Sequence, residues 1–140
     1  MGSESSLWKT VSKHMKGRWE ADRIENSAAL GTPDVYYTLR EPYMNVMGWL
    51  ELKYVHEWPV RACTPMKIPH FTPQQRLFIQ RHFPYGCNVK LLLQVARDYI
   101  LLEGDKALLI DTLTKQGLFD AGYHWQGKID YDTFSFILQP

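Results

Sequence analysis

Val46-Met-Gly-Trp-Leu-Glu-Leu-Lys-Tyr-Val55 is a nearly apolar stretch that carries one charged pair, Glu51 and Lys53. Its composition predicts a central strand with both faces covered. Because side chains alternate between the two faces of a strand, Glu51 and Lys53 project from the same face. Burying two charges costs free energy unless they pair or bind something. The stretch therefore predicts both the middle of a sheet and a place where chemistry can occur.

The sequence on either side predicts further helices and strands. A hydroxyl cap followed by proline at Thr72-Pro73 marks a helix start, and Leu77 is expected to pack inward. The expected helices span about 5–15 and 73–82, and the expected strands 18–24, 34–39, 46–55, 88–96 and 98–103. Loops are expected at 26–33 and in the proline-rich 56–71, with a tight turn at 97–98. This order of helix, three strands, helix and two strands indicates an α/β domain with a mixed sheet.

The C-terminal third is harder to assign. Residues 106–114 predict a short helix or strand with Leu108, Leu109 and Ile110 buried, and residues 134–138 predict an added edge strand. The balance of charge there is acidic, with three Lys or Arg residues against seven Asp or Glu in 98–140. We therefore expect residues 104–140 to form a dimer interface, a partner site or a cover for the sheet rather than to contact DNA.

Length and composition limit the class of protein. The chain has 140 residues, of which 45% are hydrophobic and 22% charged, as in an ordinary globular domain. This predicts one domain over residues 1–140. No apolar run reaches the roughly 20 residues that span a bilayer, and the first 25 residues lack the apolar core of a signal peptide. A cytoplasmic protein with two free thiols, Cys63 and Cys87, is expected.

Basic residues concentrate in the middle of the chain. Residues 53–97 carry seven Lys or Arg residues against one Asp or Glu, although the net charge of the whole chain is only +1. Such a segment favours a phosphate backbone, and a solvated basic face is the alternative. The candidate DNA contacts are Arg23, Arg61, Lys67, Arg76 and Arg81. Trp58 and Phe71 are candidates for stacking on bases or wedging a junction, and core packing is the favoured alternative.

Asp34 turns the charged pair into a candidate metal site. It follows Pro33 at the start of the strand before Val46–Val55, so Asp34 and Glu51 converge if these two strands are neighbours. Two carboxylates form a hard oxygen site suited to Mg²⁺ or Mn²⁺. Lys53 would orient a water or neutralise developing negative charge. This combination predicts phosphodiester hydrolysis, and a structural ion pair on the sheet surface is the alternative.

Three segments together resemble a known family. Gly31-Thr-Pro-Asp34, Trp49-Leu-Glu-Leu-Lys53 and Phe71-Thr-Pro-Gln-Gln75 are similar to the motifs of the PD-(D/E)XK nuclease superfamily. The pattern, over residues 4–103, most resembles the VRR-NUC and Holliday-junction-resolvase-like branch found in phages and bacteria. The resemblance implies a restriction-endonuclease-like fold with helices flanking a mixed central sheet. For a phage-encoded protein, the location would be the host cytoplasm.

The resemblance also implies roles for individual residues. Asp34 and Glu51 would bind the metal together with the Leu52 carbonyl, and Lys53 would be the catalytic lysine. An additional acidic residue on the first helix would be Glu4, with Glu20 as its competitor. The glutamine that follows the Glu-x-Lys motif would be Gln75, with Gln74 as the poorer candidate.

The expected activity is Mg²⁺- or Mn²⁺-dependent DNA cleavage, on branched or structured DNA, by a homodimer. A nicking or restriction-like nuclease is one alternative, and a non-catalytic DNA-binding or assembly protein with the same fold is another. No phosphate-binding loop or paired Cys or His spacing occurs in the sequence, which argues against a nucleotide cofactor and a zinc site.

Overall fold

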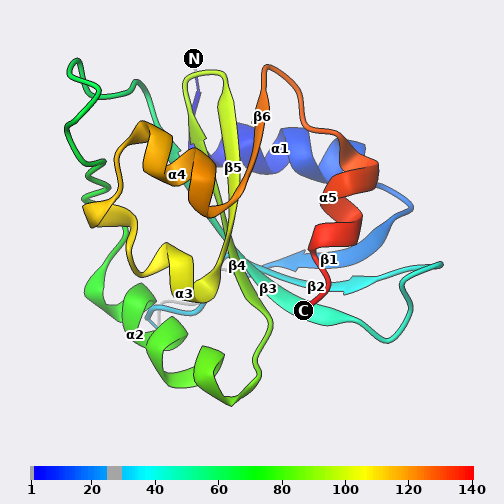
Figure 1. Ribbon diagram of the computed structural model, residues 1–140. Helices are drawn as coiled ribbons and strands as arrows, with labels where there is room; N and C mark the ends of the chain where they lie inside the picture. Colours follow the sequence, from blue (N-terminus) through cyan, green and yellow to red (C-terminus); the bar gives the residue numbers. More distant parts are fainter. Residues whose placement is uncertain (1, 25–29) are drawn as a thin grey trace.

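The computed structural model describes residues 2–24 and 30–140 and contains one six-stranded sheet (Figure 1). The strands are β1 (Trp19–Arg23), β2 (Val35–Leu39), β3 (Met47–Val55), β4 (Val89–Val95), β5 (Asp98–Glu103) and β6 (Tyr123–Gln126). They lie side by side in chain order. All neighbours are antiparallel except β3 and β4, which are parallel. The prediction of an α/β domain with a mixed sheet is confirmed.

The parallel pair at the centre requires a crossover, and α2 (Pro73–His82) supplies it. The apolar side chains of β4 alternate between two hydrophobic cores, with Leu92 in one and Leu91 and Leu93 in the other. A strand that is covered on both sides needs apolar residues at successive positions. This explains why the sequence of β4 shows no alternation of polar and apolar residues.

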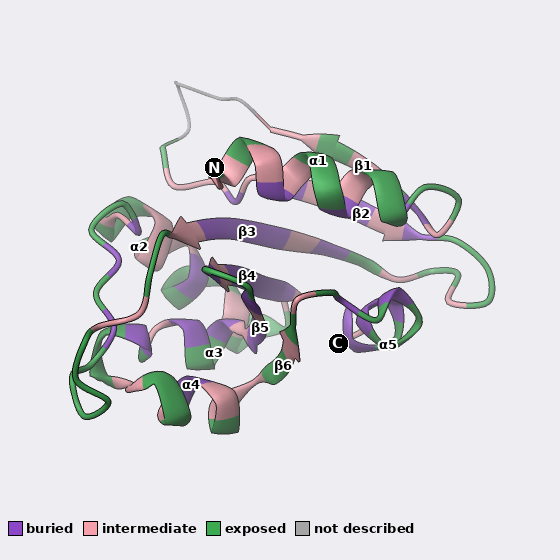
Figure 2. Ribbon diagram, turned by 90° about the horizontal axis from the view of Figure 1, so that it is seen from above, coloured by how far each residue is buried: buried purple, intermediate pink, exposed green. Residues whose placement is uncertain are grey.

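Helices cover both faces of the sheet (Figures 1 and 2). α1 (Glu4–His14) and α5 (Tyr131–Ile137) pack on one face, where Leu7, Val11 and Phe134 are buried. The other face is covered by α2, α3 (Gly104–Ala107), α4 (Lys115–Ala121) and residues 66–71. Short 3-10 turns at Phe83–Tyr85 and Ile110–Thr112 connect these elements.

The starts of the two long helices are capped by their own sequence. Thr72 accepts a hydrogen bond from the backbone N–H of Gln75 at the start of α2, as predicted. Ser3 caps α1 in the same way through the N–H of Ser6.

Among the described residues, no helix has both the length and the apolar character needed to cross a membrane.

The C-terminal segment differs from the prediction. Residues 134–138 were expected to add an edge strand, but Tyr131–Ile137 form α5, and the outermost strand is Tyr123–Gln126. Asp130 caps this helix by accepting hydrogen bonds from the N–H groups of Asp132 and Thr133. Phe134, Ile137 and Leu138 then recur at helical spacing on the face that packs on the sheet.

Three leucines also differ from the prediction. Leu77 was expected to point inward but is 49% exposed, because Ile79 is the residue that α2 buries. Leu108 and Leu109 were expected to be buried with Ile110, yet Leu109 is 48% exposed and Leu108 is only partly covered. α3 ends at Ala107, and the following turn directs only Ile110 into the core.

The turn expected at 97–98 lies at 96–97, and the loop expected at 26–33 falls partly on residues 25–29, outside the described residues.

A second charged pair, which the sequence analysis did not single out, lies on β4 and β5. The Lys90 side chain is fully buried and donates to Glu103 Oε1 at 2.8 Å and to Asn88 Oδ1 at 3.0 Å. Asn88 also donates to the Leu138 carbonyl at 2.9 Å, as does the Tyr37 hydroxyl at 2.6 Å. This network joins the centre of the sheet to the end of α5.

The two halves of this pair should respond differently to substitution. Glu103→Ala leaves a buried ammonium group with Asn88 as its remaining partner, and should lower the free energy of unfolding by about 3 kcal/mol. Lys90→Met removes the buried charge and leaves Glu103, whose side chain is 42% exposed, in contact with water. Its cost should stay below roughly 1 kcal/mol. Urea denaturation measures both, and equal losses would contradict this account.

Candidate functional site

Glu51 and Lys53 lie on the same face of β3, as predicted, and both are buried. Their exposed fractions are 1% and 2%. Leu50 and Leu52 point into the core under α1, so Glu51 and Lys53 point to the other face, toward residues 70–71. Lys53 Nζ lies 3.2 Å from Glu51 Oε1. The surface ion pair weighed as the alternative is therefore excluded by the burial of both side chains.

Asp34 lies beside this pair, immediately before β2. The ladder between β2 and β3 ends with Val35 opposite Leu50, so the next position places Asp34 opposite Glu51. Asp34 Oδ2 accepts a hydrogen bond from the Leu52 N–H at 2.8 Å. Because the N–H and C=O of one strand residue point to the same side, the Leu52 carbonyl also faces this end of β2. The structure thus brings Asp34, Glu51 and Leu52 together.

Glycine at position 31 explains how the loop before Asp34 is held. Gly31 has φ +92°, and a Cβ atom there would lie 2.3 Å from the carbonyl oxygen of Gln74. Only glycine allows the backbone to approach the first turn of α2 so closely. The Gly31-Thr-Pro-Asp34 element is therefore fixed against α2 as well as against β3.

Glu4 reaches the same site from the first residue of α1. Its Oε1 lies 3.7 Å from Lys53 Nζ, and its Oε2 lies 3.3 Å from Nε2 of His70. Glu20, its competitor, forms an ion pair with Arg40 on the exposed side of β1 instead. The structure thus brings Glu4 and not Glu20 to the charged pair, and the role of Glu4 remains a prediction.

The electrostatics of the site centre on Glu51. Burial raises the pKa of its carboxyl group well above the ordinary value of 4.5, and the negative charge of Asp34 raises it further. The positive charge of Lys53 opposes both effects on this pKa. A group held in this way favours any ligand that brings positive charge close to it.

Two observations bear on a metal ion. No group of three or more His, Cys, Asp or Glu side chains has a metal-binding arrangement within residues 2–24 and 30–140. However, Glu51 Oε1 is buried and has no hydrogen-bond partner in the described part of the chain, although Lys53 Nζ lies 3.2 Å away. Mg²⁺ commonly binds one or two carboxylates and keeps several waters. Asp34, Glu51 and the Leu52 carbonyl fit such a site.

Gln75 has a structural contact that the sequence did not reveal. Its side-chain oxygen accepts a hydrogen bond from the Thr72 N–H at 2.9 Å, which completes the cap of α2. Gln74 is exposed on the same turn. The structure gives neither glutamine a contact with Glu51 or Lys53, and the catalytic role of Gln75 stays a prediction.

The candidate DNA contacts divide into two groups. Arg61, Lys67 and Arg81 are exposed, and Arg23 is partly exposed at the end of β1. Arg76 instead forms an ion pair with Asp111 at 2.9 Å, and its guanidinium lies 4.4 Å from the centre of the Phe71 ring. It is therefore held by the protein itself.

The two aromatic candidates for base stacking also make contacts within the protein. Phe71 is 2% exposed and packs in the core, which is the alternative to base stacking. Trp58 is partly buried and donates to Asp98 Oδ2 at 2.8 Å, while its ring contacts Phe119. His70, in contrast, was missed by the sequence analysis, because no motif or spacing marks it.

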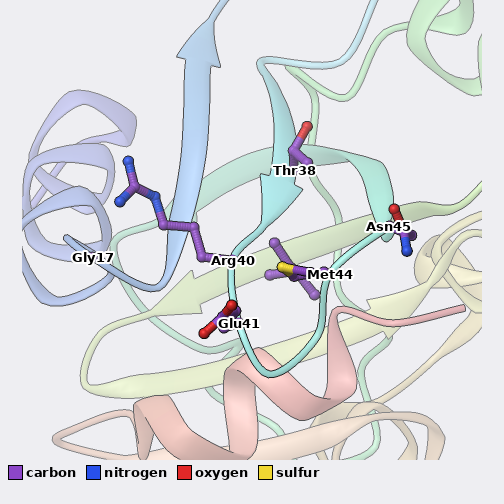
Figure 3. A pocket seen from close by; sticks show the side chains of 7 residues that line it. Gly17, Thr38, Arg40, Glu41, Met44 and Asn45 are labelled. Atoms are coloured by element: carbon purple, nitrogen blue, oxygen red, sulfur yellow. The ribbon is translucent and has the colours of Figure 1, made fainter.

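A pocket at the opposite end of β2 does not share this chemistry (Figure 3). It is lined by Gly17, Thr38, Leu39, Arg40, Glu41, Met44 and Asn45. Thr38 and Leu39 end β2, whereas Asp34 precedes its start. The pocket is open, and its Arg40 is paired with Glu20. The candidate site residues therefore lie around Glu51 and not in this pocket.

The chain is similar to solved structures, one of which is an archaeal protein. No family model matches the chain. No curated protein gives a significant match either. The 1.6 Å structure of Archaeoglobus fulgidus Hjc, a Holliday junction resolvase from an archaeal hyperthermophile, is 13% identical to the chain with a TM-score of 0.48. The alignment covers 72% of this chain and 77% of that chain.

The raised pKa of Glu51 predicts a specific pH dependence for the metal-free protein. The unfolded chain loses this proton near pH 4.5, whereas the native chain keeps it to higher pH. The free energy of unfolding should therefore fall as the pH rises from 4.5 through the native pKa, by up to about 1.4 kcal/mol per pH unit. Glu51→Gln should remove this fall.

Urea denaturation in EDTA between pH 4 and pH 8 measures the effect as the difference between wild type and variant. Glu57→Gln, at an exposed position two residues after β3, is the control and should leave the pH dependence unchanged. Parallel curves for wild type and Glu51→Gln would show that Glu51 is charged in the native state at little cost.

Proposed function

We propose that this chain is a metal-dependent DNA endonuclease of the PD-(D/E)XK type, which hydrolyses phosphodiester bonds with Mg²⁺ or Mn²⁺. The observation that carries the proposal is the buried oxygen of Glu51, which lacks a hydrogen-bond partner among the described residues although Lys53 Nζ lies 3.2 Å from it. Leaving such a group unsatisfied costs free energy in a purely structural ion pair. A bound cation would offset this cost by pairing with the Glu51 oxygen.

Each residue then has a chemical task. Asp34, Glu51 and the Leu52 carbonyl would hold the metal, with Glu4 as a further carboxylate at the edge of the site. A bound divalent ion polarises a phosphoryl oxygen and lowers the pKa of water. The Lys53 ammonium group, 3.2 Å from Glu51 Oε1, would orient the attacking water or stabilise negative charge on the phosphate.

The resemblance to the VRR-NUC and Holliday-junction-resolvase-like branch favours branched or structured DNA as the substrate. A nicking or restriction-like enzyme would use the same residues on a different substrate. The chain brings one set of site residues together, so cutting both strands at one place would favour two copies. We therefore propose a homodimer, and the mass in solution tests this.

The two buried lysines provide a matched pair for testing the site. Lys53→Met should lower the cleavage rate by about 100- to 1000-fold, because it removes the positive charge beside the scissile phosphate. Lys90→Met removes an equally buried lysine from the next strand and should leave the rate unchanged. The rates are measured with Mg²⁺ on linear, nicked, flapped and four-way-junction DNA.

Asp34→Ala and Glu51→Ala extend the same assay. Both should abolish cleavage, and cleavage that persists in both would refute the assignment of the site. Binding of DNA by the wild type without cleavage in either Mg²⁺ or Mn²⁺ would instead support a non-catalytic DNA-binding protein with this fold.

The exposed basic residues predict how DNA binding depends on salt. Arg61→Ala and Lys67→Ala should each weaken binding to all DNA sequences and reduce the slope of log K against log salt by about 1. Arg76→Ala should affect protein stability rather than this slope, because the Arg76 guanidinium already pairs with Asp111 and lies over the Phe71 ring. Fluorescence anisotropy between 50 and 200 mM salt, in EDTA, separates the two effects, and a slope unchanged in Arg61→Ala and Lys67→Ala would exclude both as phosphate contacts.

A further inference from the structure

A pair of aromatic side chains lies next to the charged residues of the candidate site. Trp49 precedes Glu51 by two residues on β3, so their side chains project from the same face, about 7 Å apart along the strand. Tyr36 lies directly opposite Trp49 on β2, two residues after Asp34. The same face of the β2–β3 pair therefore carries two carboxylates and, one step along the strands, two aromatic rings.

Neighbouring side chains hold the two rings in place. The Trp49 ring makes an edge contact with Tyr36, with ring centres 5.0 Å apart, and another with Phe78 of α2 at 5.7 Å. The Tyr36 hydroxyl donates to the sulfur atom of Met47 at 2.9 Å. Both rings are partly exposed despite these contacts. They form a fixed apolar wall that a ligand can reach from solvent.

The two rings line one side of an open pocket with a volume of about 370 Å³, between the start of β3 and residues 86–88. Met47, which is 58% exposed, and the exposed amide side chain of Asn45 also line it. None of the described residues that line this pocket has a charged side chain. Aromatic walls with an amide nearby suit a flat, uncharged ring whose edge carries hydrogen-bonding groups.

A nucleobase has this character, and the charged pair indicates where its phosphate would lie. Under the proposed function, the scissile phosphate lies beside Lys53, which shares the face of β3 that carries Trp49. The base of an adjoining nucleotide is then within reach of the two rings. In a duplex each base is paired and stacked, so it must leave the stack before it contacts an aromatic side chain. An unpaired base costs least to bring out, and the rings therefore favour it.

We propose that the pocket beside Tyr36 and Trp49 binds an unpaired nucleobase of the DNA substrate. The inference rests on the proposed DNA cleavage and deepens it, because it favours DNA with an unpaired nucleotide next to the cut, such as a flap or a bulge, over uninterrupted duplex. It requires no metal ion, so binding can be measured in EDTA.

The test compares two single strands of equal length and charge, one of twelve thymidine nucleotides and one of twelve abasic nucleotides. Fluorescence anisotropy in EDTA measures both Kd values. Wild-type protein should bind the thymidine strand about 5- to 150-fold more tightly, because a base gains this much from stacking on an aromatic ring. Tyr36→Leu and Trp49→Leu should each weaken binding of the thymidine strand and leave binding of the abasic strand unchanged.

Two further variants separate loss of the ring from loss of the fold. Trp49→Phe keeps an aromatic ring and should retain most of the preference for the thymidine strand. Trp125→Leu removes a partly buried tryptophan from β6, outside the pocket, and should keep the wild-type preference. Unfolding temperatures are measured in parallel. If Trp49→Leu proves unfolded, Tyr36→Leu must show the selective loss, and its absence would overturn the inference.

Equal affinity of the wild type for the two strands would also overturn it, as would losses in Tyr36→Leu and Trp49→Leu that are the same for both strands. The failure of the proposed function has a different signature. Wild-type protein that prefers the thymidine strand but cleaves no DNA in Mg²⁺ or Mn²⁺ refutes the nuclease and keeps the pocket. Wild-type protein that cleaves DNA but binds both strands equally refutes the pocket alone.

Discussion

The burial of a glutamate and a lysine side by side on β3 is the constraint on which the site depends. Two charges in a central strand require partners from outside that strand. Asp34 is fixed beside them by the Leu52 N–H, the His70 carbonyl accepts from Lys53, and Glu4 approaches Lys53 from the start of α1. Each partner comes from a different segment, so the charged pair brings together four parts of the chain.

The two buried lysines show how differently one residue type can be used. Lys90 has close hydrogen bonds to Glu103 and Asn88, and its network continues to the end of α5. Lys53 is surrounded by carboxylates, one of which keeps a buried oxygen without a hydrogen bond among the described residues. Satisfied buried networks fix a structure, whereas unsatisfied groups mark places where a ligand can bind. The contrast separates the stabilising pair from the candidate site.

The proline-rich segment combines exposure with firm attachment. Near its start, Trp58 is bound to Asp98 on β5, and at its end Phe71 lies in the core with Arg76 over its ring. Between these points Arg61 is exposed. The segment thus offers a basic surface to solvent while its last residues support the site. Trp58 and Phe71, which were weighed as base-stacking residues, hold the segment in place.

The sequence predicts the central strand, the shared face of Glu51 and Lys53, the cap of α2 and the mixed α/β sheet, because these follow from local periodicity and capping. It did not determine α5, since a short apolar run fits either a strand or a helix until Asp130 caps it and the sheet offers it a face. The packing of distant segments sets the rest: Glu4 rather than Glu20 contacts Lys53, Arg76 pairs with Asp111, and His70 contacts Glu4. These contacts join residues far apart in the chain, and their geometry is set by how the helices and the proline-rich segment pack on the sheet, which no local pattern encodes.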